Sequence, residues 1–142
     1  MRFSKKVNYG LVFLMQLHYA WPGHKAVKEL AEADGLPQKF LEGIASDFRK
    51  TGFCEVKRGA QGGYKLARPL KDITLLEVIR CLDPEWERQT VVTSRERKSS
   101  KQEAVSLFLK DISHSVETVF GDVKLDALPA LNKHEDTLMY YI

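Results

Sequence analysis

The chain has 142 residues, of which 44% are hydrophobic and 29% are charged, a composition typical of a folded globular domain. No stretch approaches the ~20 consecutive apolar residues that a membrane span requires, and no small-residue cleavage site follows the basic N-terminus, so we expect neither a membrane anchor nor a signal peptide. Two cysteines are too few for a disulfide framework, which favours a reducing, cytoplasmic setting.

The net charge of +3 is the sum of two unequal halves. Residues 1–68 contain 12 Lys and Arg against 6 Asp and Glu, a balance of +6, whereas residues 69–142 contain 10 against 13, a balance of −3. A basic N-terminal half is typical of nucleic-acid-binding proteins, although runs of charge also occur on ordinary solvated surfaces.

Three helices are predicted in the first third of the chain. Residues 5–20 are apolar on several sides, which predicts a buried helix that ends at Trp21-Pro22-Gly23. A short helix follows and ends at Asp34-Gly35, and a third helix is expected over about 37–51. The third helix has a clean apolar stripe formed by Phe40, Leu41, Ile44, Ala45 and Phe48. Two short helices joined by so few residues predict a helix-turn-helix.

After Gly52 the hydrophobic period changes to two. Two short strands, over about 53–57 and 64–67, flank a glycine-rich tip and predict a hairpin. The tip is not a phosphate-binding loop, because no Gly-Lys-Ser/Thr follows it and the next element is a strand. We therefore predict a mainly α fold with a small β-hairpin, a winged helix-turn-helix over residues 1–82.

The C-terminal half is expected to contain two more helices. The pattern Thr74-Leu75-Leu76-Glu77 is a capping box that opens the first, and the polar, highly charged residues 83–101 are expected to form a flexible connection. A long helix is predicted from about 102 to 120, with apolar residues spaced 3, 4, 4 and 3 apart in one seam. We interpret residues 102–132 as a dimerisation helix region, with a monomer core as the alternative; the seam consists of Val105, Phe108, Ile112, Val116 and Val119.

Several side chains are candidates for DNA contact. The first turns of the second helix of a helix-turn-helix point into the major groove, which selects Gln38, Lys39 and Glu42. Glu42 fits there as an acceptor for cytosine N4, or else it is exposed to solvent or paired with Lys39 or Lys50. Arg49, Lys50 and Lys65 are candidates for phosphate contacts, which add affinity without reading sequence.

The remaining candidates lie on the first helix and at the hairpin tip. Arg58, followed by Gly59, is placed to enter a narrow minor groove. Gly59, Gly62 and Gly63 are expected to serve backbone geometry and close approach. Tyr9 is expected either to hydrogen-bond a phosphate or to pack.

The runs Leu36–Glu42, Phe48–Phe53 and RGAQGGYKLARP (58–69), together with Ile73-Thr74 and Val78-Ile79, are similar to those of the IscR/NsrR/CymR group of bacterial winged-helix regulators, the Rrf-two family. The resemblance spans residues 2 to about 130. It implies a homodimeric transcription factor, not an enzyme, that binds a palindromic operator and whose long C-terminal helix crosses between protomers. Gly43 stands where relatives place a glutamine, so base reading at that step should be relaxed or altered relative to them.

The chain departs from the members of the family that sense iron, nitric oxide or redox state. Those proteins carry three cysteines in the connection before the dimer helix, where this chain has none and offers only Cys54 and Cys81 elsewhere. Iron–sulfur clusters are held by thiolates, and the four histidines show no metal-ligand spacing. We therefore expect no metal or cofactor. Within the family, the resemblance then implies the cluster-free branch and, with it, a role in sulfur or cysteine metabolism. Two alternatives stay open: a redox or iron–sulfur sensor that uses these two cysteines, and a protein–protein adaptor with weak DNA binding.

The last residues, 133–142, are expected to form a C-terminal tail. The tail ends in Tyr140, Tyr141 and Ile142, similar to the aromatic-rich tails of the cluster-free branch. The resemblance implies a complex with cysteine synthase. Separately, a free carboxylate beside an apolar side chain, as at Ile142, suits capture by a pocket lined with backbone donors. The alternative is that the tail folds back onto the dimer helices.

Overall fold

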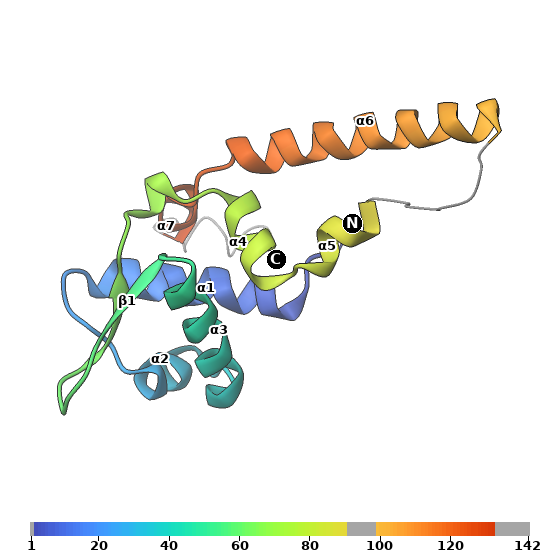
Figure 1. Ribbon diagram of the computed structural model, residues 1–142. Coiled ribbons are helices and arrows are strands. Elements are labelled where there is room, and N and C mark those ends of the chain that lie inside the picture. Colours follow the sequence, from blue (N-terminus) through green and yellow to red (C-terminus); the bar gives the residue numbers. More distant parts are fainter. Residues whose placement is uncertain (1, 91–98, 133–142) are drawn as a thin grey trace.

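The computed structural model describes residues 2–90 and 99–132 and is mainly helical (Figure 1). The elements, in chain order, are α1 (Lys5–Ala20), α2 (Val27–Asp34), α3 (Gln38–Lys50), β1 (Cys54–Lys57), β2 (Gly63–Leu66), the short 3-10 helix η1 (Leu70–Asp72), α4 (Leu75–Leu82), α5 (Glu85–Thr90), α6 (Ser100–Asp122) and α7 (Ala127–Asn132). The predicted fold class, a mainly α chain with one hairpin, is confirmed.

Helix α1 is the centre of the fold. The Ser4 side chain caps its first turn by accepting a hydrogen bond from the backbone N–H of Val7. Gly10 allows α4 to come close, because a Cβ built there would lie 2.3 Å from Cδ1 of Leu82. The buried residues of α1 form one broad face of the helix; they are Val7, Gly10, Phe13, Leu14 and Leu17. Tyr19, on another side, is half exposed, so the prediction of a helix buried on several sides is confirmed only in part.

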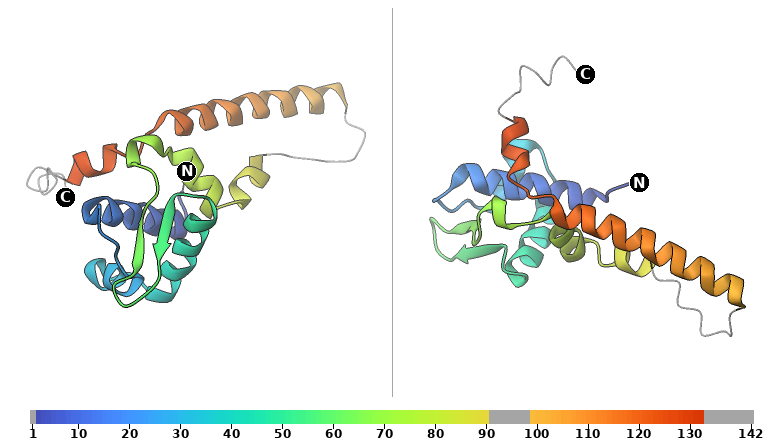
Figure 2. Two further views of the ribbon diagram at one scale, coloured as in Figure 1. Left: turned by 60° about the vertical axis from the view of Figure 1, so that its left-hand side comes forward. Right: turned by 90° about the horizontal axis from the view of Figure 1, so that it is seen from above.

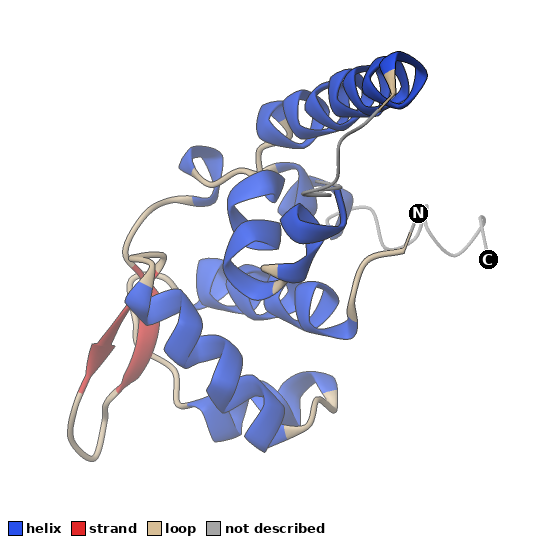
Figure 3. Cartoon of the chain, turned by 45° about the vertical axis from the view of Figure 1, so that its right-hand side comes forward, coloured by secondary structure: helices blue, strands red, loops and turns tan. Residues whose placement is uncertain are grey.

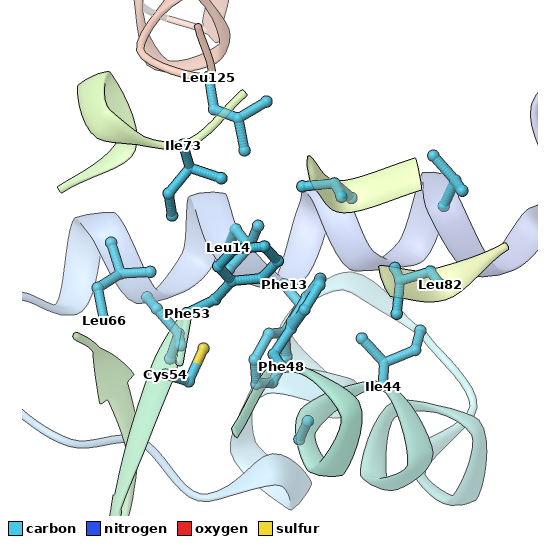
Figure 4. Packing of buried hydrophobic residues seen from close by; sticks show 14 of the residues in the cluster. Phe13, Leu14, Ile44, Phe48, Phe53, Cys54, Leu66, Ile73, Leu82 and Leu125 are labelled. Atoms are coloured by element: carbon cyan, nitrogen blue, oxygen red, sulfur yellow. The ribbon is translucent and has the colours of Figure 1, made fainter. Parts of the chain in front are cut away.

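The core joins α1 to every element of the winged helix. Phe13 and Leu14 of α1 pack with Phe48 of α3, Phe53 and residues of the hairpin, all nearly inaccessible to solvent (Figure 4). The rings of Phe13 and Phe48 lie 6.0 Å apart between centroids. Because α3 and the hairpin share this core, their positions relative to each other are set by packing.

Helices α2 and α3 form the predicted helix-turn-helix. Gly35 ends α2 in the left-handed conformation, with φ +63°, and its N–H bonds the carbonyl of Ala31. Pro37 stands at the N-cap of α3, where the missing N–H leaves no helical bond unmade. The turn therefore directs the chain into α3 within three residues.

The hairpin is the wing. Strands β1 and β2 pair antiparallel with Cys54 opposite Leu66 and Lys57 opposite Gly63. The other edge of β2 pairs with the loop before α2, since Lys25 and Tyr64 exchange backbone hydrogen bonds of 2.9 and 2.8 Å. The wing is thus tied to the helix-turn-helix through its backbone.

The capping box at α4 is present as predicted. The hydroxyl of Thr74 accepts from the N–H of Glu77, whose carboxylate accepts from the N–H of Thr74 at 2.8 Å. The chain beyond α6 returns to this point, because the N–H of Leu75 bonds the carbonyl of Val123 at 2.9 Å. This pairing anchors the end of α6 to the winged helix.

Two helices were not expected. Part of the connection predicted over 83–101 is helical, since α5 occupies Glu85–Thr90 and α6 already begins at Ser100; residues 91–98 lie outside the described residues. Helix α5 is held by Trp86, whose ring lies 5.7 Å from that of Phe120 on α6. The predicted region 102–132 is likewise divided, because the chain leaves the helix at Val123 and forms α7 around the buried Pro129.

Helix α6 lies on one side of α1 and α4, and α2, α3 and the hairpin lie on the other (Figures 2 and 3). Within residues 2–90 and 99–132, no helix is both long enough and apolar enough to cross a membrane. The fold thus presents two separate surfaces, one formed by the winged helix and one by α6.

Candidate nucleic-acid interface

Helix α3 turns one face into the core and the other to solvent. Leu41, Ile44 and Phe48 are fully buried, and at 3.6 residues per turn the opposite side carries Lys39, Gly43, Ser46 and Lys50. Two contacts with α1 hold the helix in place. Lys6 forms an ion pair with Asp47 at 2.8 Å, and the ring of Tyr9 meets that of Phe40 edge-on, with centroids 5.5 Å apart.

The predicted base-reading residues lie together at the start of α3. Gln38, Lys39 and Glu42 are all exposed. The side-chain amide of Gln38 donates to the carboxylate of Glu42 at 3.2 Å, so the partner of Glu42 is this amide rather than either lysine. A neutral partner leaves the negative charge of Glu42 uncompensated and available to a donor such as cytosine N4.

The cations of this surface stand free of carboxylates. Lys39, Arg49 and Lys50 on α3 and Lys57 and Arg58 on the wing are exposed. None of the five forms an ion pair with another residue of the part of the chain that the structure describes. Unpaired surface cations of this kind are the groups that bind phosphates and release counterions.

Lys65 is placed differently from the other predicted phosphate contacts. Its ammonium lies 2.9 Å from the carboxylate of Glu55 on β1 and 5.5 Å from the ring centre of Trp21. Adjacent positions across the strand pair bring Lys65 and Glu55 together. A phosphate would have to compete with this carboxylate, so Lys65 is a weaker candidate than Arg58.

Strand alternation adds Lys57, which was not among the predicted DNA contacts, to the candidate site. Along β1 the even positions, Cys54 and Val56, face inward, while Glu55 and Lys57 are exposed. Lys57 therefore lies beside Arg58 as a second cation of the wing. The alternation of apolar and polar residues in the sequence could have predicted that Lys57 faces outward.

Two glycines build the wing tip through close contacts, as expected. A Cβ on Gly62 would lie 2.1 Å from the carbonyl oxygen of Lys57, and one on Gly63 would lie 2.3 Å from the carbonyl carbon of Lys25. Gly59, with φ +117°, has a backbone conformation that other residues rarely adopt. These positions shape the turn that presents Arg58.

The predicted seam of α6 is largely uncovered. Val105, Phe108, Ile112 and Val119 are between 51% and 64% exposed, and only Val116 packs partly against the core. The opposite side of α6 rests on α4, where Glu117 pairs with Arg80 at 3.7 Å and Phe120 is buried. The helix thus has one face used within the chain and one apolar face without a partner among the described residues.

The described residues do not suit an iron–sulfur cluster. No group of three or more His, Cys, Asp or Glu side chains within residues 2–90 and 99–132 is arranged to hold a metal ion. Burial, with a smaller contribution from Cys81, raises the pKa of the Cys54 thiol to about 12. Burial also raises the pKa of Cys81, which lies 3.4 Å from the hydroxyl of Thr51. Cluster ligands are thiolates, and both sites disfavour that form.

The predicted partner-binding residues Tyr140, Tyr141 and Ile142 lie outside the described residues. The chain is described up to Asn132, whose side-chain amide donates to the hydroxyl of Tyr19 at 3.0 Å.

Comparison with known proteins extends the resemblance. Residues 3–130 match the Rrf2 model, described as an iron-dependent transcriptional regulator. CymR of Bacillus subtilis is 29% identical, with 100% of both chains covered. The regulator Rv1287 of Mycobacterium tuberculosis is 40% identical over 58% of this chain and 52% of its own length. The chain spans about half the length of the first curated relatives that it matches.

Solved structures agree with the sequence relatives. The structure of CymR, the global cysteine regulator of B. subtilis, superimposes with a TM-score of 0.70 at 26% identity, covering 92% of this chain and 98% of that one. IscR of T. potens gives a TM-score of 0.70 at 29% identity and covers 99% and 97%. Because the family model matches most of the chain, the chain belongs to the Rrf2 family of DNA-binding transcriptional regulators.

Proposed function

We propose that the protein is a homodimeric repressor that binds a palindromic operator without an iron–sulfur cluster and controls genes of sulfur or cysteine supply. The observation that carries the proposal is the separation of two surfaces. Helix α3 and the wing, whose exposed cations form no ion pair among the described residues, lie on one side of α1, and α6, which carries the uncovered apolar seam, lies on the other (Figure 1).

The seam supports a dimer. Side chains such as Phe108 and Ile112 are more than half exposed on a 23-residue helix, and a helix with an apolar stripe of this spacing is stabilised by a second helix. A two-fold pairing of α6 would leave both winged helices free, since DNA contacts are expected on the far side. Two copies related in this way read two inverted half-sites.

The two thiols support a cluster-free regulator. Cys54 is buried in the core beside Phe53 and Leu66, and its pKa of about 12 keeps it protonated at neutral pH. The redox-sensor alternative would require one of these thiols to react, and the raised pKa values of both argue against it. The adaptor alternative does not account for the unpaired cations on α3 and the wing.

The link to cysteine supply rests on similarity. The CymR relative covers this chain from end to end, and its structure is that of a global cysteine regulator. The same similarity is the reason to propose repression and a complex between the tail residues Tyr140, Tyr141 and Ile142 and cysteine synthase.

Selection of DNA from a random duplex library by the full-length protein tests the core of the proposal. We expect an inverted repeat, bound by two copies of the chain, with affinity that falls steeply as salt rises. Enrichment of single half-sites by a monomer would contradict the dimer. No enrichment and a shallow salt dependence would contradict sequence-specific binding and support the adaptor alternative.

A titration tests the partner. A peptide of residues 133–142 is added to the host's cysteine synthase while the fluorescence of its pyridoxal phosphate is followed, and a peptide that lacks Ile142 is the control. Saturable binding that requires Ile142 supports the partner proposal. Absence of binding by both the peptide and the full-length dimer refutes it and leaves the DNA-binding proposal standing.

A further inference from the structure

Gly43 lies in the interior of α3, six residues after the N-cap. Glycine is the least favourable residue in a helix interior apart from proline, because its backbone loses the most conformational freedom. A glycine at such a position therefore needs a reason in packing, in backbone geometry or in what binds there.

The fold does not supply a reason. A Cβ built on Gly43 meets no atom within 4 Å, and its φ is not in the left-handed region. The contrast is Gly10 of α1, where a Cβ would lie 2.3 Å from a side-chain atom of Leu82. Alanine would fit at position 43 and would favour the helix.

The place of Gly43 on the surface of α3 accounts for a glycine in this helix. It lies on the face of α3 opposite the buried residues, one turn from Lys39 before it and two turns from Lys50 after it. Both lysines are exposed and form no ion pair within residues 2–90 and 99–132. Gly43 is thus the centre of the surface that enters the major groove under the proposed function.

We propose that Gly43 is a specificity-determining residue of the DNA interface: the missing side chain lets the backbone of α3 approach the base edges. This inference rests on the proposed function and adds a residue that reads DNA by shape rather than by hydrogen bonds. In this chain, whose docking is adapted to the missing side chain, adding a side chain at position 43 moves α3 away from the groove. The contacts of Gln38 and Glu42 then lengthen, although their own side chains are unchanged.

The test compares the full-length protein with Gly43→Ala and with a matched control, Gly121→Ala. Gly121 is the other helical glycine without a tight contact, since a Cβ there would lie 3.6 Å from Leu76, and it faces away from the seam of α6. Thermal unfolding, sedimentation and binding to the DNA selected by the wild type are measured for all three.

We expect Gly43→Ala to unfold at a higher temperature than the wild type, to keep the wild-type oligomeric state and to bind the selected DNA about tenfold more weakly or worse, the loss typical of a withdrawn base contact. Gly43→Gln should bind that DNA more weakly still, and Gly121→Ala should bind it as the wild type does. A variant that is more stable and yet binds less cannot owe its loss to misfolding.

Two results overturn the inference. Equal binding by the wild type and Gly43→Ala means that the helix does not need the missing side chain, and a less stable Gly43→Ala means that the fold does need it. Both leave the proposed function intact. Failure of the wild type to select any DNA refutes the proposed function itself, and the inference with it.

Discussion

Substitution of Phe108 by alanine should dissociate the proposed dimer. Phe108 is 64% exposed in the single chain, and a phenylalanine that becomes buried covers roughly 200 Å². The exposed part therefore amounts to about 130 Å², which at ~25 cal/mol per Å² corresponds to about 3 kcal/mol per protomer. Alanine retains part of this area, so we expect a loss of about 2 kcal/mol per protomer.

Two-fold symmetry doubles the effect. Each dimer contains the substitution twice, so the dimerisation free energy should weaken by about 4 kcal/mol, or about a thousandfold in the dissociation constant. Sedimentation equilibrium over a range of protein concentrations measures this constant directly. The thermal stability of the monomer should change little, because the side chain packs against little of its own chain.

Leu107→Ala is the matched control. Leu107 is 63% exposed, but it lies about 100° around α6 from Phe108 and outside the seam. It should weaken the dimer far less. Equal effects of Phe108→Ala and Leu107→Ala would show that exposure alone, and not the seam, governs association, and a monomeric wild type would refute the reasoning altogether.

Three further predictions concern the wing, the thiols and the capping box. Arg58→Ala should weaken DNA binding most at A·T-rich flanks and lower the slope of log affinity against log salt by about 1. Lys65→Ala should cause a smaller loss of affinity, because Glu55 already pairs with Lys65. Anisotropy titrations across a set of operators measure both losses, and equal losses would contradict the different roles of the two residues. With its pKa at about 12, Cys54 should resist alkylation at pH 8 until the protein is unfolded, which mass spectrometry of alkylated peptides checks; rapid native labelling would show that the thiol is accessible. Burial opposes the charge of Glu77, but hydrogen bonds from the Thr74 backbone and from Arg68 outweigh burial and lower its pKa below 4.5; its ionised form therefore stabilises the fold above that pH, and the effect is lost as pH falls through the lowered pKa. Glu77→Gln keeps a side-chain acceptor for the capping box but loses the charge, so it should be about 0.5 kcal/mol less stable than the wild type at pH 7. In denaturant titrations the gap should close as the pH falls through the lowered pKa of Glu77; a gap that does not depend on pH would contradict this.

Local features of the sequence were sufficient to predict most elements. The spacing of Leu41, Ile44 and Phe48 was sufficient to predict α3, and the capping box at Thr74 was sufficient to predict α4. Both signals act over three or four residues, within the reach of one helical turn. The same is true of the period of two in β1, which also placed Lys57 outward.

Helices α5 and α7 escaped prediction for a physical reason. Each has six residues, too few to be stable on its own. Helix α5 is stabilised by the contact of Trp86 with Phe120, 34 residues later in the chain, and α7 is stabilised by burial of Pro129. No local pattern reports a helix that tertiary packing stabilises.

The sequence by itself determined the winged helix, the family and the set of candidate cations, because periodicity, capping and the RGAQGGYKLARP run are properties of neighbouring residues. Only the tertiary structure decided which charges are free. It paired Lys65 with Glu55 across the hairpin, left Arg58 without an ion pair among the described residues, and buried Cys54 so deeply that its thiol stays protonated. These outcomes depend on distances between residues of different strands and helices, and packing sets those distances.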